Sequence, residues 1–223
     1  MMQPFTDPAA VARYVDETPR KVPGFADLQR MAMLLLAEHA PGGADILVLG
    51  AGGGLELKVF AQAQPRWRLL GVDPSAQMLD LARDVLGPLG SRVDLLEGYV
   101  DDVPAGPFDG AACLLTLHFL ARRERLHTLA QLRARLRPGA PLVVAHHSCP
   151  QEGRLRHWLE RSVAFAGDGR ADRAQVSASA ALMADRLPVL PAAEDEALLA
   201  EAGFSDIALF YAGFTFRGWV AFA

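Results

Sequence analysis

The sequence has little cysteine and no long uninterrupted apolar segment. Cys113 and Cys149 are its two cysteines, too few for the disulfide framework of a small secreted domain. No segment approaches the roughly 20 consecutive apolar residues that a membrane helix needs, and Met1–Glu17 lacks the basic flank and apolar stretch of a signal peptide. These absences predict a cytoplasmic protein in a reducing environment, with no membrane partner.

Positive charge is also scarce. The formal net charge is -4, with 22 lysines and arginines against 26 acidic residues, which argues against indiscriminate binding to a phosphate backbone. Six arginines gather in one segment and offer a local contact for RNA, but leucines at helical spacing on its other face favour a solvated helix surface. Small molecules are therefore favoured over RNA as partners. The six are Arg122, Arg123, Arg125, Arg133, Arg135 and Arg137.

The composition that remains is that of one ordered domain, 51% hydrophobic and 22% charged over 223 residues. Short apolar runs alternate with helical patterns, which predicts a mostly parallel sheet covered by helices, a doubly wound, Rossmann-like α/β fold. The predicted strands are 45–49, 67–72, 92–96, 108–114 and 142–145, and the helices between them are 55–64, 75–86 and 123–136.

Two further regions frame this alternation. N-terminal helices at 7–17 and 25–40, within residues 1–42, are separated by breaks at Thr18-Pro19 and Pro23-Gly24. Residues 150–191 read as a helical insertion, which is either a cap over a pocket or packing filler. A helix at 194–202, closed by Gly203, then leads to strands 207–211 and 214–222. We treat residues 1–223 as one domain.

A glycine-rich loop follows the first predicted strand. A strand that runs directly into such a loop and then a helix lets the backbone turn sharply and approach a ligand. Dinucleotide enzymes use a similar loop, and a glycine-rich turn without a ligand is the other alternative. The loop comprises Gly50, Ala51, Gly52, Gly53 and Gly54.

The second predicted strand ends at Asp73, about twenty residues after the glycines. A carboxylate at this point can accept both hydroxyl hydrogens of a ribose. Pro74 stops the strand, and Ser75 can cap the next helix through its hydroxyl. Met78, one turn into that helix, either packs on a nucleobase or belongs to the helix core.

Two further segments resemble parts of a known enzyme family, and together they make that resemblance specific. Leu136–Val144 resembles the L-K-P-G-G segment of class I methyltransferases, and Leu198–Phe204 resembles their helix and turn before the last two strands. The resemblance implies a seven-stranded sheet with the last strand antiparallel. It also implies S-adenosylmethionine bound over strands one, two and four, with S-adenosylhomocysteine as product. By the same resemblance Val100 and Asp101 would lie beside the adenine, and Leu114, Leu115 and Thr116 beside the methionine part. Tyr99, which precedes Val100, is a further candidate contact of the cofactor.

A narrower resemblance points to carboxy-S-adenosylmethionine synthases, which act in tRNA wobble-uridine modification. It rests on the segments 20–25, 117–120 and 213–216. The chain departs from that family at three positions, where Phe25 replaces a tyrosine, Tyr99 an aspartate and Leu114 an asparagine. The arginine that holds the family's extra carboxylate should fall near Ala178–Ala180, where no basic residue occurs. Because a buried anion without a cationic partner is costly, we infer the lineage without the activity.

Most class I methyltransferases carry an acid two residues before the first glycine, where this chain has Val48. Glu56 either compensates by facing the positive charge of the cofactor or is an exposed glutamate in the first turn of a helix. The sequence therefore leaves two functions open beside methyl transfer to a small molecule. They are a non-catalytic or weakly binding member of the fold, and a tRNA-modification enzyme.

Methyl transfer mainly requires that the nucleophile be held on the axis of the breaking bond. A base for the acceptor would be a histidine, and His118, His146 and His147 follow the fourth and fifth strands. Structural histidines are the alternative. His146, His147 and Cys149 match no common zinc spacing, so no metal is assigned. Tyr14, Phe25 and Trp158 are candidate walls for the acceptor, and a homodimer is compatible with the sequence.

Overall fold

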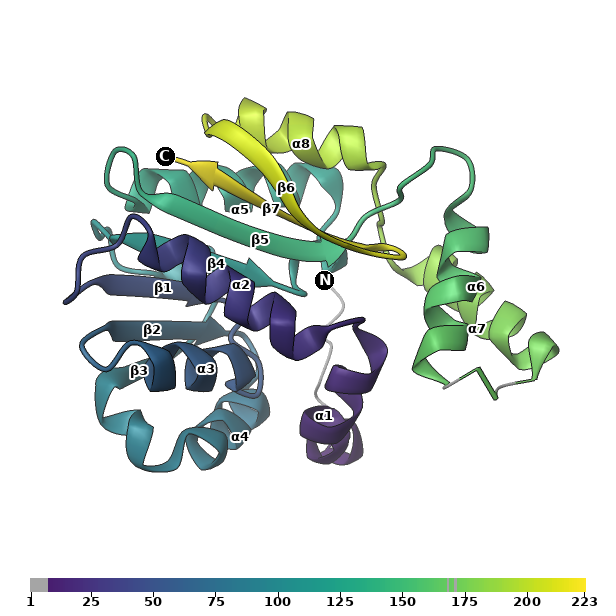
Figure 1. Cartoon of the computed structure of the whole chain (residues 1–223), viewed down its shortest axis with the longest axis horizontal. Coiled ribbons are helices and arrows are strands. Elements are labelled where there is room, and N and C mark those ends of the chain that lie inside the picture. Colours follow the sequence, from purple (N-terminus) through teal and green to yellow (C-terminus); the bar gives the residue numbers. More distant parts are fainter. Residues whose placement is uncertain (1–7, 168, 171) are drawn as a thin grey trace.

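The computed structural model describes residues 8–167, 169–170 and 172–223. Seven strands form one sheet in the order β3-β2-β1-β4-β5-β7-β6 (Figure 1). Strand β7 runs antiparallel to both of its neighbours, while the pairs among β1 to β5 are parallel. The predicted doubly wound sheet with an antiparallel last strand is therefore confirmed. The strands are β1 Asp45–Leu49, β2 Arg68–Asp73, β3 Val93–Glu97, β4 Gly110–Leu114, β5 Pro141–His147, β6 Ser205–Gly213 and β7 Phe216–Phe222.

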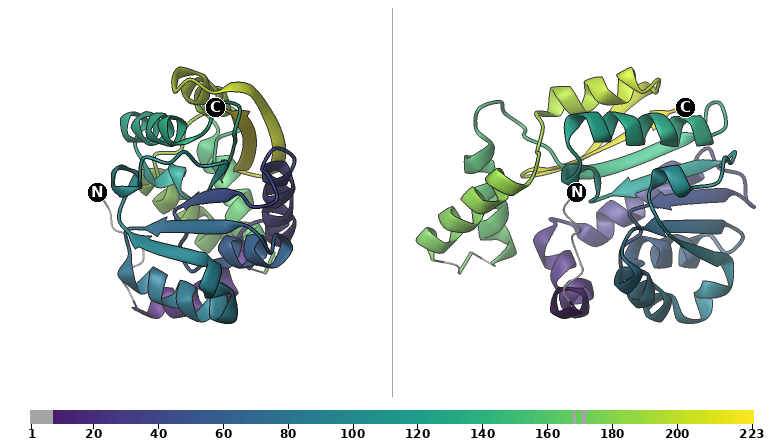
Figure 2. Two further views of the ribbon diagram at one scale, coloured as in Figure 1. Left: turned by 90° about the vertical axis from the view of Figure 1, so that its left-hand side faces the viewer. Right: turned by 180° about the vertical axis from the view of Figure 1, so that it is seen from behind.

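Helices cover both faces of the sheet. One face packs against α2 (Phe25–Ala37) and α3 (Leu55–Ala63), and the other against α5 (Arg122–Arg135) and α8 (Ala192–Glu201). Seen from behind in Figure 2, α5 and α8 lie over the face opposite α2. The four residues that follow Asp45 in β1 are all apolar because both faces of the strand are buried: Ile46 and Val48 enter the first core, and Leu47 and Leu49 enter the second.

The remaining helices lie around this sandwich. Helix α4 (Ala76–Leu86) follows β2 and contacts α3. Three short 3-10 helices, η1 (Gly87–Arg92), η2 (Val100–Asp102) and η3 (Leu117–Phe119), connect the central elements. The insertion forms α6 (Leu155–Ala166) and α7 (Arg173–Arg186), which pack on each other and stand beyond the carboxyl edge of the sheet (Figure 1). Within the described ranges, no helix is long and apolar enough to cross a membrane.

Two of the boundaries that differ from the prediction lie beside the site. Helix α1 (Pro8–Lys21) continues through Thr18-Pro19, because Pro19 falls in its last turn, where a missing N–H costs one hydrogen bond near the end of the helix. The predicted start at Asp7 lies outside the described residues. Strand β5 is longer than expected because β7 pairs with it up to His147. His146 and His147 thus lie inside the strand, not after it.

The order of strands reverses between β1 and β4. Strands β2 and β3 extend the sheet to one side of β1, and β4, β5 and β7 extend it to the other. Open α/β sheets bind ligands beyond the carboxyl ends of the strands at such a switch point. The glycine loop follows β1 at this place, and α1 with the insertion lies over the same edge (Figure 1).

Candidate functional site

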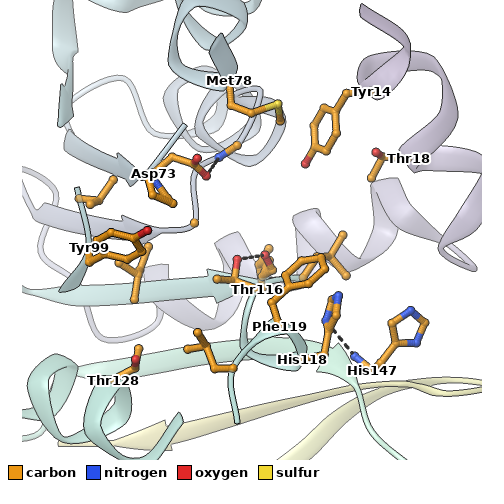
Figure 3. Close-up of a pocket in the computed structure, with 18 of the residues that line it drawn as sticks. Tyr14, Thr18, Asp73, Met78, Tyr99, Thr116, His118, Phe119, Thr128 and His147 are labelled. Atoms are coloured by element: carbon orange, nitrogen blue, oxygen red, sulfur yellow. Dashed lines mark hydrogen bonds between the residues drawn. The ribbon is translucent and has the colours of Figure 1, made fainter. Parts of the chain in front are cut away.

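A cavity of about 1130 Å³ opens at the carboxyl ends of β2, β1, β4 and β5. It exceeds the roughly 300–1,000 Å³ of a typical small-molecule site, so it has room for more than one small ligand. Side chains from α1, α5, α6, α7 and β7 complete its walls. Figure 3 shows part of this lining, with Asp73 and Tyr99 on one side and His118 and His147 on the other.

The glycine loop forms one wall of the cavity. Gly50 and Gly52 line it with left-handed φ angles of 74° and 48°. A Cβ on Gly50 would lie 1.9 Å from Oγ1 of Thr116, and one on Gly54 would lie 2.9 Å from Cβ of Ala82. The protein's own packing therefore demands glycine at these two positions, beside any ligand. Ala51, Gly53 and Gly54, predicted to contact the cofactor, do not line the cavity.

Asp73 ties the loop to the next helix. Its carboxylate accepts hydrogen bonds from the backbone N–H groups of Gly52 and Ser75, both at 2.9 Å. Burial raises the pKa of Asp73, and these two bonds oppose that rise. The Ser75 hydroxyl accepts from the N–H of Met78 at 3.3 Å, which confirms the predicted cap of α4. Met78 is at once a buried helix residue and a wall of the cavity.

Residues at the ends of β3 and β4, or just after them, complete this part of the cavity lining. Tyr99, Val100 and Asp101 line the cavity, with Tyr99 41% exposed. The Asp101 carboxylate contacts Nε2 of His127 at 2.9 Å. The other predicted cofactor contacts in the lining are Pro74, Leu114, Leu115 and Thr116. Residues spread over almost seventy positions of sequence are thus brought to one edge.

The three predicted acceptor walls separate in the structure. Tyr14 lies over the glycine loop, its hydroxyl 3.1 Å from where a Cβ on Gly52 would be (Figure 3). Burial, with Glu56 and Asp73 nearby, raises the pKa of Tyr14 above its ordinary range. Phe25 packs in the core instead. Trp158 stacks under Arg161, 4.2 Å from the ring centroid, and does not line the cavity.

The three histidines also separate. His118 and His147 line the cavity, whereas His146 lies on the opposite face, 3.2 Å from the carboxylate of Asp195. The reason is the alternation of side chains along β5. The backbone N–H of His147 donates to Nδ1 of His118 at 3.3 Å. Burial above all holds the pKa of His118 well below its ordinary value and lowers that of His147 to about 3.

The prediction of a solvated arginine helix was wrong for Arg125. This side chain is wholly buried and forms an ion pair with Asp195 of α8. Its guanidinium also donates to the carbonyl of Pro188 at 3.0 Å. The pair links α5, α8 and the end of the insertion. The arginine pattern could not reveal this, since the partner is 70 residues away.

Glu56 is not the exposed glutamate considered above. It is 5% exposed, in the first turn of α3 beneath the glycine loop, and it does not line the cavity. Burial raises the pKa of Glu56 to about 8, and Asp73 adds to this rise. Val48 is fully buried in the core. Among the described residues, no cluster of three or more His, Cys, Asp or Glu side chains could hold a metal.

Several residues of the cavity have no signal in the sequence. The insertion contributes Ser162, Val163, Ala166 and Met183, and β7 contributes Phe216. Ser162 bonds to Thr215 across 53 residues at 2.8 Å. Because these contacts join an insertion to the last hairpin, no local pattern predicts them. That the insertion acts as a cap over the pocket stays a prediction.

Comparison with known proteins agrees with this fold. Residues 47–142 match the model of a methyltransferase domain. The carboxy-S-adenosyl-L-methionine synthase of Chromohalobacter salexigens is 30% identical over 222 residues, which cover 97% of this chain and 82% of the relative. A structure from Nostoc punctiforme, described as a proposed O-methyltransferase, has a TM-score of 0.71 at 20% identity. The match covers 98% of this chain and 61% of the Nostoc chain. An S-adenosylmethionine-dependent methyltransferase from Aquifex aeolicus has a TM-score of 0.66 at 17% identity, and the match covers 97% of this chain and 98% of the Aquifex chain.

Proposed function

The chain belongs to the carboxy-S-adenosyl-L-methionine synthase family of S-adenosylmethionine-dependent methyltransferases, and we propose that it methylates a small molecule bound in the same cavity. Its cofactor is S-adenosylmethionine. The observation that carries the proposal is the cavity itself. A single volume of about 1130 Å³ runs from Asp73, at the end of β2, to His147, at the end of β5.

The residues at the β2 end fit the cofactor. Asp73 is held by two backbone N–H groups, and its remaining lone pairs can accept the hydrogens of a ribose diol. Met78 and Tyr99 provide surfaces for the adenine, with Val100 and Asp101 at its edge. Gly50 and Thr116 border the methionine part. Tyr14 closes this end from α1.

When bound, S-adenosylmethionine supplies a methyl group on a sulfonium sulfur. Methyl transfer would require a lone pair of the acceptor aligned with the S–CH₃ bond. The chain's contribution is to hold the two reactants on one axis and keep water away. The enclosed walls from α1 and the insertion serve both purposes.

Calorimetric titration with S-adenosylmethionine and S-adenosylhomocysteine tests this function. Both should bind, and Asp73→Asn should weaken both by roughly tenfold or more, because the amide cannot accept from every donor around it. Asp80→Asn is the matched control, since this carboxylate lies on the exposed side of α4 with Arg83. No heat with either nucleoside would refute the proposal and favour a non-catalytic member of the fold.

Formation of a carboxylated cofactor, the activity in the name of the relative, is the second candidate. It would place an extra carboxylate beyond the methyl position, where a buried anion needs a cation. The residue that α7 contributes to the cavity lining is the uncharged Met183, and the segment Ala178–Ala180 has no cationic side chain to pair with such a carboxylate. Methyl transfer is therefore favoured. Mass spectrometry of the nucleoside that co-purifies with the protein distinguishes the two, and tRNA modification would require the carboxylated form.

A further inference from the structure

The cavity has one end that carries formal charge and one that does not. The acidic and basic side chains that carry formal charge come from α1, the end of β2, η2 and α5: they are Arg13, Glu17, Lys21, Asp73, Asp101, Asp102, Arg123 and Glu124, with His127 beside Asp101. In the described part of the chain, β4, η3, β5, α6, α7 and β7 add only neutral groups. Asp73 and His147 are three strands apart, about 14 Å at the usual spacing.

The cations of α1 do not alter this division. Arg13 and Lys21 both pair with Glu17, at 2.9 and 2.7 Å, and their side chains are 58% and 56% exposed. They are solvated charges on the rim, which contribute little to a buried ligand. The walls beyond Thr116 are instead apolar, formed by Phe119, Val163, Ala166, Met183 and Phe216.

His118 is a hydrogen-bond donor toward this uncharged end. A backbone N–H can only donate, so Nδ1 of His118, which accepts from His147, carries no proton. The neutral ring must then carry its proton on Nε2. This nitrogen faces the cavity (Figure 3). His118 therefore offers an N–H to a ligand and cannot remove a proton from it.

His147 has the opposite character. Its Nδ1 lies 2.7 Å from Oγ1 of Thr215, which lies 2.8 Å from Oγ of Ser162, and that hydroxyl reaches the carbonyl of Trp158 at 3.4 Å. Because a carbonyl only accepts, the arrangement that uses every contact runs from His147 Nδ1–H to Thr215, to Ser162 and to the carbonyl. Nε2 of His147 is then left with a lone pair.

We propose that the acceptor is an uncharged phenol-like molecule, whose hydroxyl accepts a hydrogen bond from Nε2–H of His118 and donates one to Nε2 of His147. The inference rests on the proposed methyl transfer. The two rings meet edge to face, with centroids 4.8 Å apart, and both line the cavity, so they stand side by side at its uncharged end. The aromatic and aliphatic walls suit the ring, and the lack of a cation disfavours a carboxylate.

The reaction balances with these two groups. A lone pair of the hydroxyl oxygen attacks the methyl carbon, the S–CH₃ electron pair passes to sulfur, and the hydroxyl proton moves to Nε2 of His147. A protonated ether is a far stronger acid than an imidazolium ion, so a weakly basic histidine suffices. Thr215 then accepts from Nδ1–H of the cationic ring, and the proton on Nε2 leaves to water when the product departs.

Three probes of similar size test the inference by NMR titration in the presence of S-adenosylhomocysteine. They are 4-methylphenol, its methyl ether 4-methylanisole, and 4-hydroxybenzoate. We expect 4-methylphenol to bind about tenfold more tightly than either of the others, the difference that one or two hydrogen bonds or an unpaired carboxylate supply. Equal or tighter binding of 4-hydroxybenzoate, or no binding of 4-methylphenol, overturns the inference.

Two variants add a readout that a merely structural role would not move. His118→Phe and His147→Phe keep a ring in place and should each abolish the preference for the phenol over its methyl ether. The affinity for S-adenosylhomocysteine should stay unchanged in both. If the preference survives both substitutions, the inference is wrong. Failure of S-adenosylhomocysteine to bind the unmodified protein would instead refute the proposed function, so the two failures are distinguishable.

Discussion

His147 donates its backbone N–H to Nδ1 of His118 at 3.3 Å, and in this way one histidine fixes the tautomer of the other. The bond exists because β5 ends beside η3, so the last residue of a strand meets the first turn after the neighbouring strand. The three histidines predicted as bases thus take three different roles. His118 donates into the cavity, His147 accepts, and His146 joins a buried ion pair behind the sheet.

The first prediction concerns the ring of His118. Nitrogen NMR should find a proton on Nε2 and none on Nδ1, with no titration between pH 5 and 8, because burial holds the pKa well below its ordinary value. His118→Gln serves to assign the signal. A proton on Nδ1, or a midpoint within that range, would contradict the assignment.

The second prediction concerns stability in acid. The pKa of His147 is about 3 in the folded protein and about 6.5 in an unfolded chain. The unfolded state therefore binds the extra proton first, and stability falls as pH decreases from about 6.5 toward 3. Between pH 7 and pH 4.5, the melting temperature of His147→Gln should fall by less than that of the unmodified protein. If the melting temperatures of the two proteins fall in parallel as pH decreases, this prediction is wrong.

Glu56 gives the opposite dependence. Burial raises its pKa to about 8, against about 4.3 in an unfolded chain. The folded protein holds a proton that the unfolded chain has released, so stability falls as pH rises from about 4.3 through 8. Glu56→Gln should match the unmodified protein at pH 4.5 and melt at a higher temperature at pH 8.5. Thermal unfolding at the two pH values checks this, and a variant that is less stable at pH 8.5 would count against a buried neutral carboxyl.

Gly50→Ala and Gly139→Ala separate two reasons for glycine. Both residues have a left-handed φ, 74° and 77°, but a Cβ on Gly139 meets nothing within 4 Å, whereas one on Gly50 overlaps Thr116. We expect Gly139→Ala to cost about 1 kcal/mol. Gly50→Ala should cost about 3 kcal/mol, the sum of that strain and overpacking. Denaturant unfolding measures both, and equal costs would exclude a steric role for Thr116.

Two ion pairs between α5 and α8 form a matched comparison. Asp195 pairs with Arg125 at 1% exposure on both sides, while Glu201 pairs with Arg122 at about half exposure. Asp195→Ala should destabilise the protein by about 3–5 kcal/mol, because it leaves a buried guanidinium without its counter-charge. Glu201→Ala should cost less than about 1 kcal/mol. Chemical denaturation of both variants decides, and similar values would contradict the importance of burial.

The sequence alone determined the fold and one end of the site. Wholly apolar runs such as Ile46–Leu49 require burial on both faces, and alternation with helices then leaves one architecture. Asp73, the glycines and Ser75 could be identified because their contacts are local: Asp73 binds the N–H of Ser75, two residues on, and that of Gly52 in the neighbouring loop. In such segments the backbone conformation and the short-range contacts depend on residues close together in the sequence, so a local pattern predicts them.

Only the tertiary structure decided the other end. Phe25 and Trp158 look like pocket aromatics in a sequence, but one enters the core and the other lies outside the lining. His146 and His147 look equivalent until the pairing of β5 with β7 sends them to opposite faces. The partners of Arg125 and Thr215 are 70 and 53 residues distant. Contacts of that kind depend on how helices and hairpins pack over a sheet, and no periodicity or local motif encodes where such side chains meet.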